Sequence, residues 1–139
     1  MYKSIQTTHH LAAPADKIWQ EISSGEAWER CLPILTGSKT EGNKRYCYMD
    51  NGDTLEESFL ASHVEKTFIY TIHKQSSFPA DNIVGIIRLE DISPEETTLH
   101  WSVDMQLTQE DAFPTLKEHI TQIYNTSAQK LADIVTASI

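Results

Sequence analysis

A carboxylate at an apolar position is the first residue that could do chemistry. Within residues 53–62, the side chains that share one face of a β-strand are Leu55, Glu57, Phe59 and Ala61. A carboxylate buried alone among apolar groups is costly, so Glu57 requires a partner or water. With a partner, Glu57 could anchor the polar end of a ligand, or act as a general acid or base whose protonation is tuned by burial. An ion pair that only braces the sheet is the structural alternative.

The partner of Glu57 depends on the turn that precedes it. Residues 44–50 and 53–62 are typical of a hairpin around Asn51-Gly52. A two-residue turn places Tyr46 opposite Glu57. A one-residue bulge instead brings three other side chains to the inner face, namely Arg45, Cys47 and Met49. The hairpin pattern alone leaves both registers open.

Aromatic side chains form a second group of candidates. Trp28, Tyr70 and Trp101 could stack on a flat ligand, or fill the core. The loop tip Phe78-Pro79 could close the mouth of a site. Gly85 lies in the middle of a strand, where the backbone permits close approach of another group.

The C-terminal stretch supplies the remaining candidates. His119, Ile123 and Ser127 lie four residues apart on one row of a helix. The imidazole and the hydroxyl could bind a ligand or relay a proton, and His119 is therefore a second catalytic candidate beside Glu57. Half-exposed residues at the edge of an apolar stripe are the structural alternative.

Periodicity predicts the elements that position these residues. Seven strands are expected at 3–11, 34–41, 44–50, 53–62, 66–74, 82–90 and 97–107. Two short helices at 15–22 and 26–30 follow the first strand, and a long amphipathic helix spans about 110–135. Short connections favour an antiparallel α+β sheet in one domain, residues 1–139. Alternation places five further side chains on the inner face of the sheet, together with Gly85. They are His9, Phe68, Ile83, Val103 and Met105.

Composition excludes several function classes. The net charge is −9 and the isoelectric point is near 5.0, and no basic stripe is present, so nucleic-acid binding is disfavoured. No apolar run approaches a membrane span, and no signal peptide is visible, so a cytoplasmic location is expected. Cys31 and Cys47 suit two reduced thiols. His9 and His10 are adjacent and point to opposite faces of a strand, and no H-x-x-x-H or C-x-x-C spacing exists, so no metal site is expected. No cofactor is expected either.

The chain resembles a known family. Three segments carry the resemblance together with the final helix: LAAPADKIWQEISSGEAWERCLP, GNKRYCYMDNGDTLEESF and TLHWSVDMQL. They look like the START-like superfamily, in its polyketide cyclase/dehydrase and lipid-transport branch. The resemblance implies a helix-grip fold, a seven-stranded curved antiparallel sheet around the C-terminal helix, with an apolar cavity between them. It also implies that Arg45 and Glu57 face this cavity.

Two specialised activities of that superfamily do not transfer cleanly. Aromatase/cyclase members carry an inward Arg further along the fourth strand, where this chain has Phe59 and Ala61. Plant hormone receptors use a long gate loop and an anchoring Lys. Here the hairpin is a short Asp-Asn-Gly-Asp, and Cys31 stands near the position of that Lys.

Three functions follow as hypotheses. The first is the binding of a hydrophobic or aromatic small molecule, lipid or polyketide-like, by a monomer or homodimer that does not insert into membranes. The expected ligand-binding residues are Trp28, Arg45, Glu57, Phe59, Tyr70, Phe78, Ile83, Gly85, Trp101, Met105, Ile123 and Ser127. The second is a cyclase or dehydratase that moves a proton with Glu57 or His119. The third is a protein-interaction domain with a filled cavity.

Overall fold

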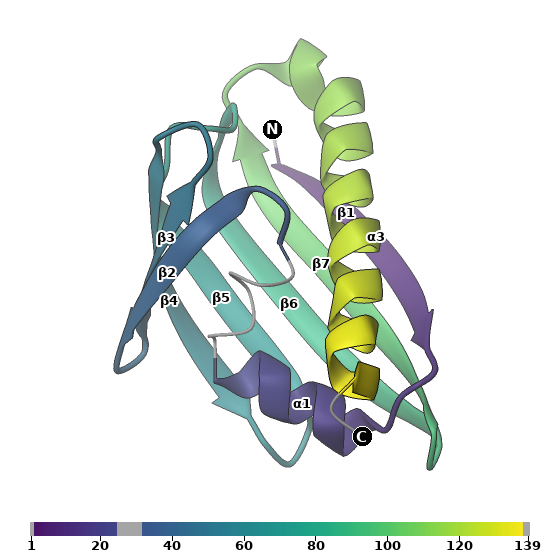
Figure 1. Ribbon diagram of the computed structural model, residues 1–139. Helices are drawn as coiled ribbons and strands as arrows, with labels where there is room; N and C mark the ends of the chain where they lie inside the picture. Colours follow the sequence, from purple (N-terminus) through teal and green to yellow (C-terminus); the bar gives the residue numbers. More distant parts are fainter. Residues whose placement is uncertain (1, 25–31, 138–139) are drawn as a thin grey trace.

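Seven antiparallel strands form one curved sheet that wraps around a long C-terminal helix (Figure 1). The computed structural model describes residues 2–24 and 32–137. The strands are β1 (Tyr2–Leu11), β2 (Leu35–Glu41), β3 (Lys44–Met49), β4 (Thr54–Ser62), β5 (Thr67–Lys74), β6 (Ala80–Ser93) and β7 (Glu96–Leu107). Helix α1 (Ala15–Ser23) follows β1, and α3 (Phe113–Ala137) follows the 3-10 turn η1 (Glu110–Ala112). The expected helix-grip architecture is confirmed.

The strand order β1-β7-β6-β5-β4-β3-β2 makes β1 and β2 the two edges of the sheet. All seven expected strands are present. The main difference in length is β6, expected at 82–90, because it pairs with β7 from Ala80 opposite Leu107 to Ser93 opposite Glu96. The expected short helix at 26–30, with Trp28, and the neighbouring Cys31 lie outside the described residues.

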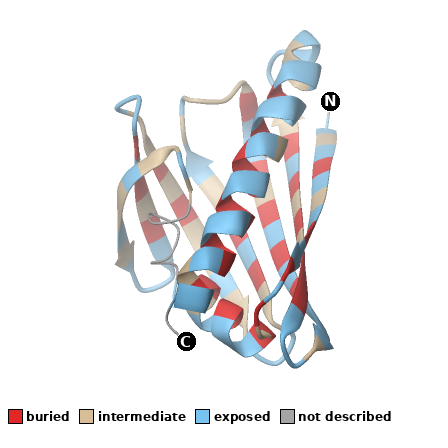
Figure 2. Ribbon diagram, turned by 45° about the vertical axis from the view of Figure 1, so that its right-hand side comes forward, coloured by how far each residue is buried: buried red, intermediate tan, exposed pale blue. Residues whose placement is uncertain are grey.

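The core lies between the concave face of the sheet and α3. Buried and exposed residues alternate along the strands, and the buried side of α3 faces the sheet (Figure 2). On β7 the alternation runs from Leu99 to Leu107, since Leu99, Trp101, Val103, Met105 and Leu107 are all buried and the residues between them are not. The period of two expected for a strand with one face in the core is therefore confirmed on this element.

The β3–β4 hairpin adopts the bulged register. The Met49 N–H donates to the Asp53 carbonyl over 2.9 Å, and the Gly52 N–H donates to the Met49 carbonyl over 3.1 Å. The loop is therefore residues 50–52, with Gly52 at a φ of 90° that favours glycine. This register pairs Arg45 with Glu57 and buries Cys47 and Met49 on the inner face.

Helix α1 closes one end of the core. Its buried side carries Ile18, Trp19 and Ile22, at the spacing of an amphipathic helix. The Trp19 Nε1–H donates to His63 Nδ1 over 2.9 Å, which ties α1 to the turn after β4. In the loop between β1 and α1, the Ala13 carbonyl accepts a hydrogen bond from the Thr97 hydroxyl over 2.7 Å, which ties this loop to β7.

Candidate functional site

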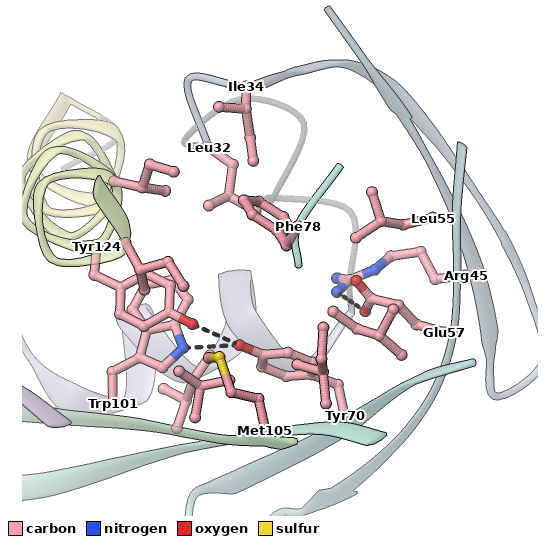
Figure 3. A pocket seen from close by; sticks show the side chains of 16 residues that line it. Leu32, Ile34, Arg45, Leu55, Glu57, Tyr70, Phe78, Trp101, Met105 and Tyr124 are labelled. Atoms are coloured by element: carbon pink, nitrogen blue, oxygen red, sulfur yellow. Dashed lines mark hydrogen bonds and ion pairs between the residues drawn. The ribbon is translucent and has the colours of Figure 1, made fainter. Parts of the chain in front are cut away.

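A cavity of about 90 Å³ lies between the concave face of the sheet and α3. Its walls are almost entirely apolar and come from β3 to β7, from α3 and from the segment before β2 (Figure 3). Pockets that enclose drug-sized ligands measure about 300–1,000 Å³. The cavity has room for one small ring, and a multi-ring molecule would have to displace side chains.

An ion pair stands on one wall of the cavity. Arg45 Nη2 lies 2.5 Å from Glu57 Oε2, and the two side chains are only 3% and 6% exposed. Burial would lower the pKa of the Arg45 guanidinium, but the Glu57 carboxylate more than offsets this effect, so that the pKa is raised. Arg45 also lies 5.9 Å from the centre of the Phe68 ring, within reach of a cation–π contact.

Cys47 completes the surroundings of the carboxylate. Its Sγ–H donates to Glu57 Oε1 over 3.8 Å, whereas Arg45 occupies the other oxygen. Burial and the Glu57 charge raise the pKa of the Cys47 thiol to about 12. The thiol is therefore protonated at neutral pH and acts as a weak hydrogen-bond donor. Glu57 is engaged through both oxygens.

Three aromatic side chains form a hydrogen-bonded group opposite the ion pair. The Trp101 Nε1–H donates to the Tyr70 hydroxyl over 3.0 Å, and the Tyr70 and Tyr124 hydroxyls are 3.1 Å apart. The Trp101 and Tyr124 rings are stacked with centroids 3.7 Å apart. Burial raises the pKa of both phenols, so both stay protonated and remain hydrogen-bond donors. Tyr70, Tyr124 and Trp101 are called the aromatic triad below.

The loop between β5 and β6 holds Phe78 against the cavity (Figure 3). Gln75 clamps this loop, since its side chain donates to the carbonyls of Phe78 and Ala80 and accepts the Phe78 N–H over 2.7 Å. Asp53, at the β3–β4 hairpin, accepts hydrogen bonds from the Ser77 hydroxyl and the Ser76 N–H. Phe78 is thus a half-buried wall residue fixed by two neighbouring segments.

Eight of the expected ligand-binding residues line the cavity. They are Arg45, Glu57, Tyr70, Phe78, Ile83, Trp101, Met105 and Ile123. They come from five strands, from α3 and from the loop before β6, so the sheet curvature brings together residues that lie far apart in the sequence. Their roles toward a ligand remain predictions.

Other expected residues lie elsewhere. Phe59 stacks on Phe68, with ring centroids 5.2 Å apart, and does not line the cavity. The space above Gly85 is occupied by the ring of Tyr70, so the close approach expected for a ligand is made by this side chain. The buried Ser127 hydroxyl donates to the Ile123 carbonyl over 2.6 Å, within its own helix.

His119 lies on the exposed side of α3. Each step of four residues turns about 40° past a full circle of the helix, so His119 and Ser127, which are two such steps apart, differ in direction by about 80° and do not share one face. His119 is therefore outside the cavity, unlike Ile123. Trp28 lies outside the described residues.

Half of the residues that line the cavity are absent from the expected ligand-binding set. These residues are Leu32, Ile34, Leu55, Ile72, Ile87, Val103, Ile120 and Tyr124. Alternation along the strands and the stripe of the helix place six of them inward, but neither pattern says which inward residue borders empty space. Leu32 and Ile34 lie in the segment before β2 and carry no such signal.

His9 is buried on the inner face of β1, and its Nε2 lies 2.8 Å from the Thr7 hydroxyl. Burial, with a smaller effect of His10, lowers the pKa of His9, so the ring is neutral near pH 7.

Among residues 2–24 and 32–137, no cluster of three or more His, Cys, Asp or Glu side chains could hold a metal ion. No helix within these ranges is long and apolar enough to cross a membrane.

Solved structures share this architecture. XoxI from Bacillus cereus superposes with a TM-score of 0.84 at 20% identity, covering 96% of this chain and 95% of that chain. The Zhui aromatase/cyclase from Streptomyces sp. R1128 gives a TM-score of 0.81 at 13% identity, covering 98% of this chain and 94% of that chain. A START superfamily protein from Mycobacterium smegmatis gives a TM-score of 0.81 at 14% identity, covering 98% of this chain and 99% of that chain. At these identities the likeness defines the fold, which is the START-like helix grip.

Residues 3–136 match the family described as polyketide cyclase / dehydrase and lipid transport. The match covers nearly the whole chain, and the protein belongs to this family. Comparison with curated proteins finds no match. The family assignment agrees with the resemblance, and it specifies neither a substrate nor a reaction for this chain.

Proposed function

We propose that this protein binds a small hydrophobic or aromatic molecule in the cavity between the sheet and α3. The observation that carries the proposal is the cavity of about 90 Å³, whose walls are apolar except for a few convergent polar groups. Burial of apolar ligand surface would supply most of the affinity, at about 25 cal/mol per Å² before ordering costs. The Arg45–Glu57 pair would orient a polar end of the ligand.

The size of the cavity favours a ligand with one ring. A related fold accommodates such molecules, since norcoclaurine synthase from Thalictrum flavum has been solved in complex with dopamine and hydroxybenzaldehyde. That enzyme superposes with a TM-score of 0.77 at 15% identity, covering 99% of this chain and 88% of that chain. A lipid or a polyketide-like chain would require the wall to open. A cytoplasmic monomer or homodimer remains the expectation from the sequence.

The geometry gives less support to a cyclase or dehydratase. Glu57 is held by Arg45 and Cys47, so the carboxylate is not positioned as an unencumbered base. His119 lies outside the cavity. Of the two candidate proton-transfer residues, only Glu57 therefore lies at the cavity.

A protein-interaction domain would have a filled interior and an apolar outer surface. Leu60, Ile69 and Ile86 do form a short exposed row across β4, β5 and β6. Stable interfaces bury about 800 Å² on each partner, which is far more than three side chains supply. The remaining cavity favours a ligand over this alternative.

Mass spectrometry of the purified protein, native and then denatured, tests the proposal by identifying any small molecule released on unfolding. Thermal unfolding with single-ring aromatic compounds is the second measurement, since a ligand that binds only the folded state raises the melting temperature. The variant Ile83→Phe should fill the cavity and abolish both signals. The matched control is Ile86→Phe, the same substitution on the outer face of β6. Equal ligand responses in both variants would contradict the proposal.

A further inference from the structure

The aromatic triad holds more hydrogen-bond donors than its bonds use. Trp101 contributes one N–H, and Tyr70 and Tyr124 contribute one O–H each, whereas the Trp101 N–H and one O–H are enough for all the hydrogen bonds within the triad. One phenolic hydrogen therefore has no acceptor within the triad. All three side chains are buried, at 3% to 8% exposed, where an unsatisfied donor is costly.

The order of donors and acceptors decides which hydroxyl carries this hydrogen. Tyr70 accepts from Trp101, and a hydroxyl that accepts a hydrogen bond becomes a stronger donor. The chain Trp101 to Tyr70 to Tyr124 is polarised in one direction, whereas in the other order the Tyr70 oxygen would accept both hydrogen bonds and the chain would not run head to tail. The head-to-tail chain ends at Tyr124, whose O–H is then the surplus donor.

The surroundings of Tyr124 offer no other acceptor. The Glu57 carboxylate bonds to Arg45 and Cys47, and Trp101, which also hydrogen-bonds to Tyr124, can only donate. Both Tyr hydroxyls point toward the middle of the cavity (Figure 3). A molecule in the cavity is therefore in position to accept this hydrogen bond.

On the basis of the proposed binding function, we propose that the Tyr124 hydroxyl donates a hydrogen bond to the ligand, and that the ligand is a neutral one-ring molecule bearing a carbonyl or ether oxygen. The apolar walls and the already paired Arg45 disfavour a charged group. The cavity volume limits the ligand to about one ring.

Two probes of nearly the same shape isolate the hydrogen bond. Acetophenone carries a carbonyl where α-methylstyrene carries a methylene carbon, so only the first can accept. We expect Tyr124→Phe to weaken acetophenone binding about three- to tenfold, measured by calorimetry, and to leave α-methylstyrene binding unchanged. Tyr48→Phe, a phenol on the outer face of β3, is the control and should affect neither probe.

Tyr70→Phe tests the direction of the chain. It removes the middle hydroxyl and leaves the Tyr124 O–H available, so this variant should keep the preference for acetophenone. The reverse pattern, with preference lost in Tyr70→Phe and kept in Tyr124→Phe, would overturn the assignment to Tyr124. The infrared carbonyl stretch of bound acetophenone is an independent readout, and it should lie at lower wavenumber in the wild-type complex than in Tyr124→Phe.

The two proposals fail in different ways. If neither probe binds the wild-type protein, the proposed function for one-ring molecules fails, and the inference about Tyr124 fails with it. If both probes bind and Tyr124→Phe weakens them equally, only the inference about Tyr124 is wrong.

Discussion

The ring of Tyr70 lies over Gly85, its cross-strand partner on β6. A Cβ atom built at Gly85 would lie 1.9 Å from Tyr70 Cζ and 2.3 Å from its hydroxyl oxygen, far inside van der Waals contact. Gly85 thus provides the space that lets Tyr70 reach Trp101 and Tyr124. Any side chain at Gly85 would displace the ring and disrupt the aromatic triad.

The first prediction concerns this contact. Gly85→Ala should destabilise the protein by about 1–3 kcal/mol, because the added methyl overlaps the Tyr70 ring. Urea unfolding measures the change. In a Tyr70→Ala background the same substitution should cost much less, and the double-mutant cycle gives the coupling. Gly37→Ala, where the nearest atom would be 3.7 Å away, is the control. Equal costs in both backgrounds would show that Tyr70 is not the obstacle.

The second prediction concerns the buried ion pair. Glu57→Gln should lower the free energy of unfolding by about 3–5 kcal/mol, because it leaves the Arg45 guanidinium buried without its countercharge. The double variant Arg45→Met/Glu57→Gln should recover part of this loss. Glu41→Gln breaks the exposed Lys39–Glu41 pair and should leave the unfolding midpoint nearly unchanged. A Glu57→Gln variant as stable as wild type would contradict the buried pair.

The third prediction concerns thiol reactivity. Because the pKa of Cys47 is raised to about 12, this residue should resist thiol reagents in the folded protein at pH 8. A Cys31→Ser background leaves Cys47 as the only thiol. Titration with a disulfide reagent should label less than one equivalent over hours in buffer, and one equivalent at once in guanidinium chloride. Rapid labelling of the folded protein would place the thiol at the surface.

The fourth prediction concerns acid stability. Hydrogen bonds from the Ser77 hydroxyl, and then from the Ser76 N–H, lower the pKa of Asp53 to about 2. The unfolded state, with a pKa near 3.9, binds more protons between about pH 4 and pH 2, so stability rises with pH across this range. The Asp53 contribution is therefore complete above about pH 4 and is lost as the pH falls toward 2.

Asp53→Asn removes this contribution. The variant should be less stable than wild type at pH 7, and the difference should shrink as the pH falls to about 2. Urea unfolding at several pH values measures both effects. Asp50→Asn, a carboxylate in the same hairpin that makes none of these bonds, is the control. A difference that is independent of pH would exclude Asp53 as the titrating group.

Local periodicity determined most of the fold. The period of two in the strands and the apolar stripe of 110–135 each depend on neighbouring residues, and they predicted all seven strands and α3. The same alternation placed Glu57 on an apolar face, which identified the buried carboxylate before its partner was known. The resemblance to the START-like superfamily added the curvature of the sheet and the presence of a cavity.

The tertiary structure decided the site. The loop at 50–52, with Gly52 at positive φ, set the register that pairs Arg45 with Glu57, and the hairpin pattern was compatible with either register. Tyr124 meets Tyr70 only because α3 lies across the concave face of the sheet at a particular depth and rotation. Such distances depend on the packing of every element at once, whereas a sequence pattern reports only which face a side chain shares with its neighbours.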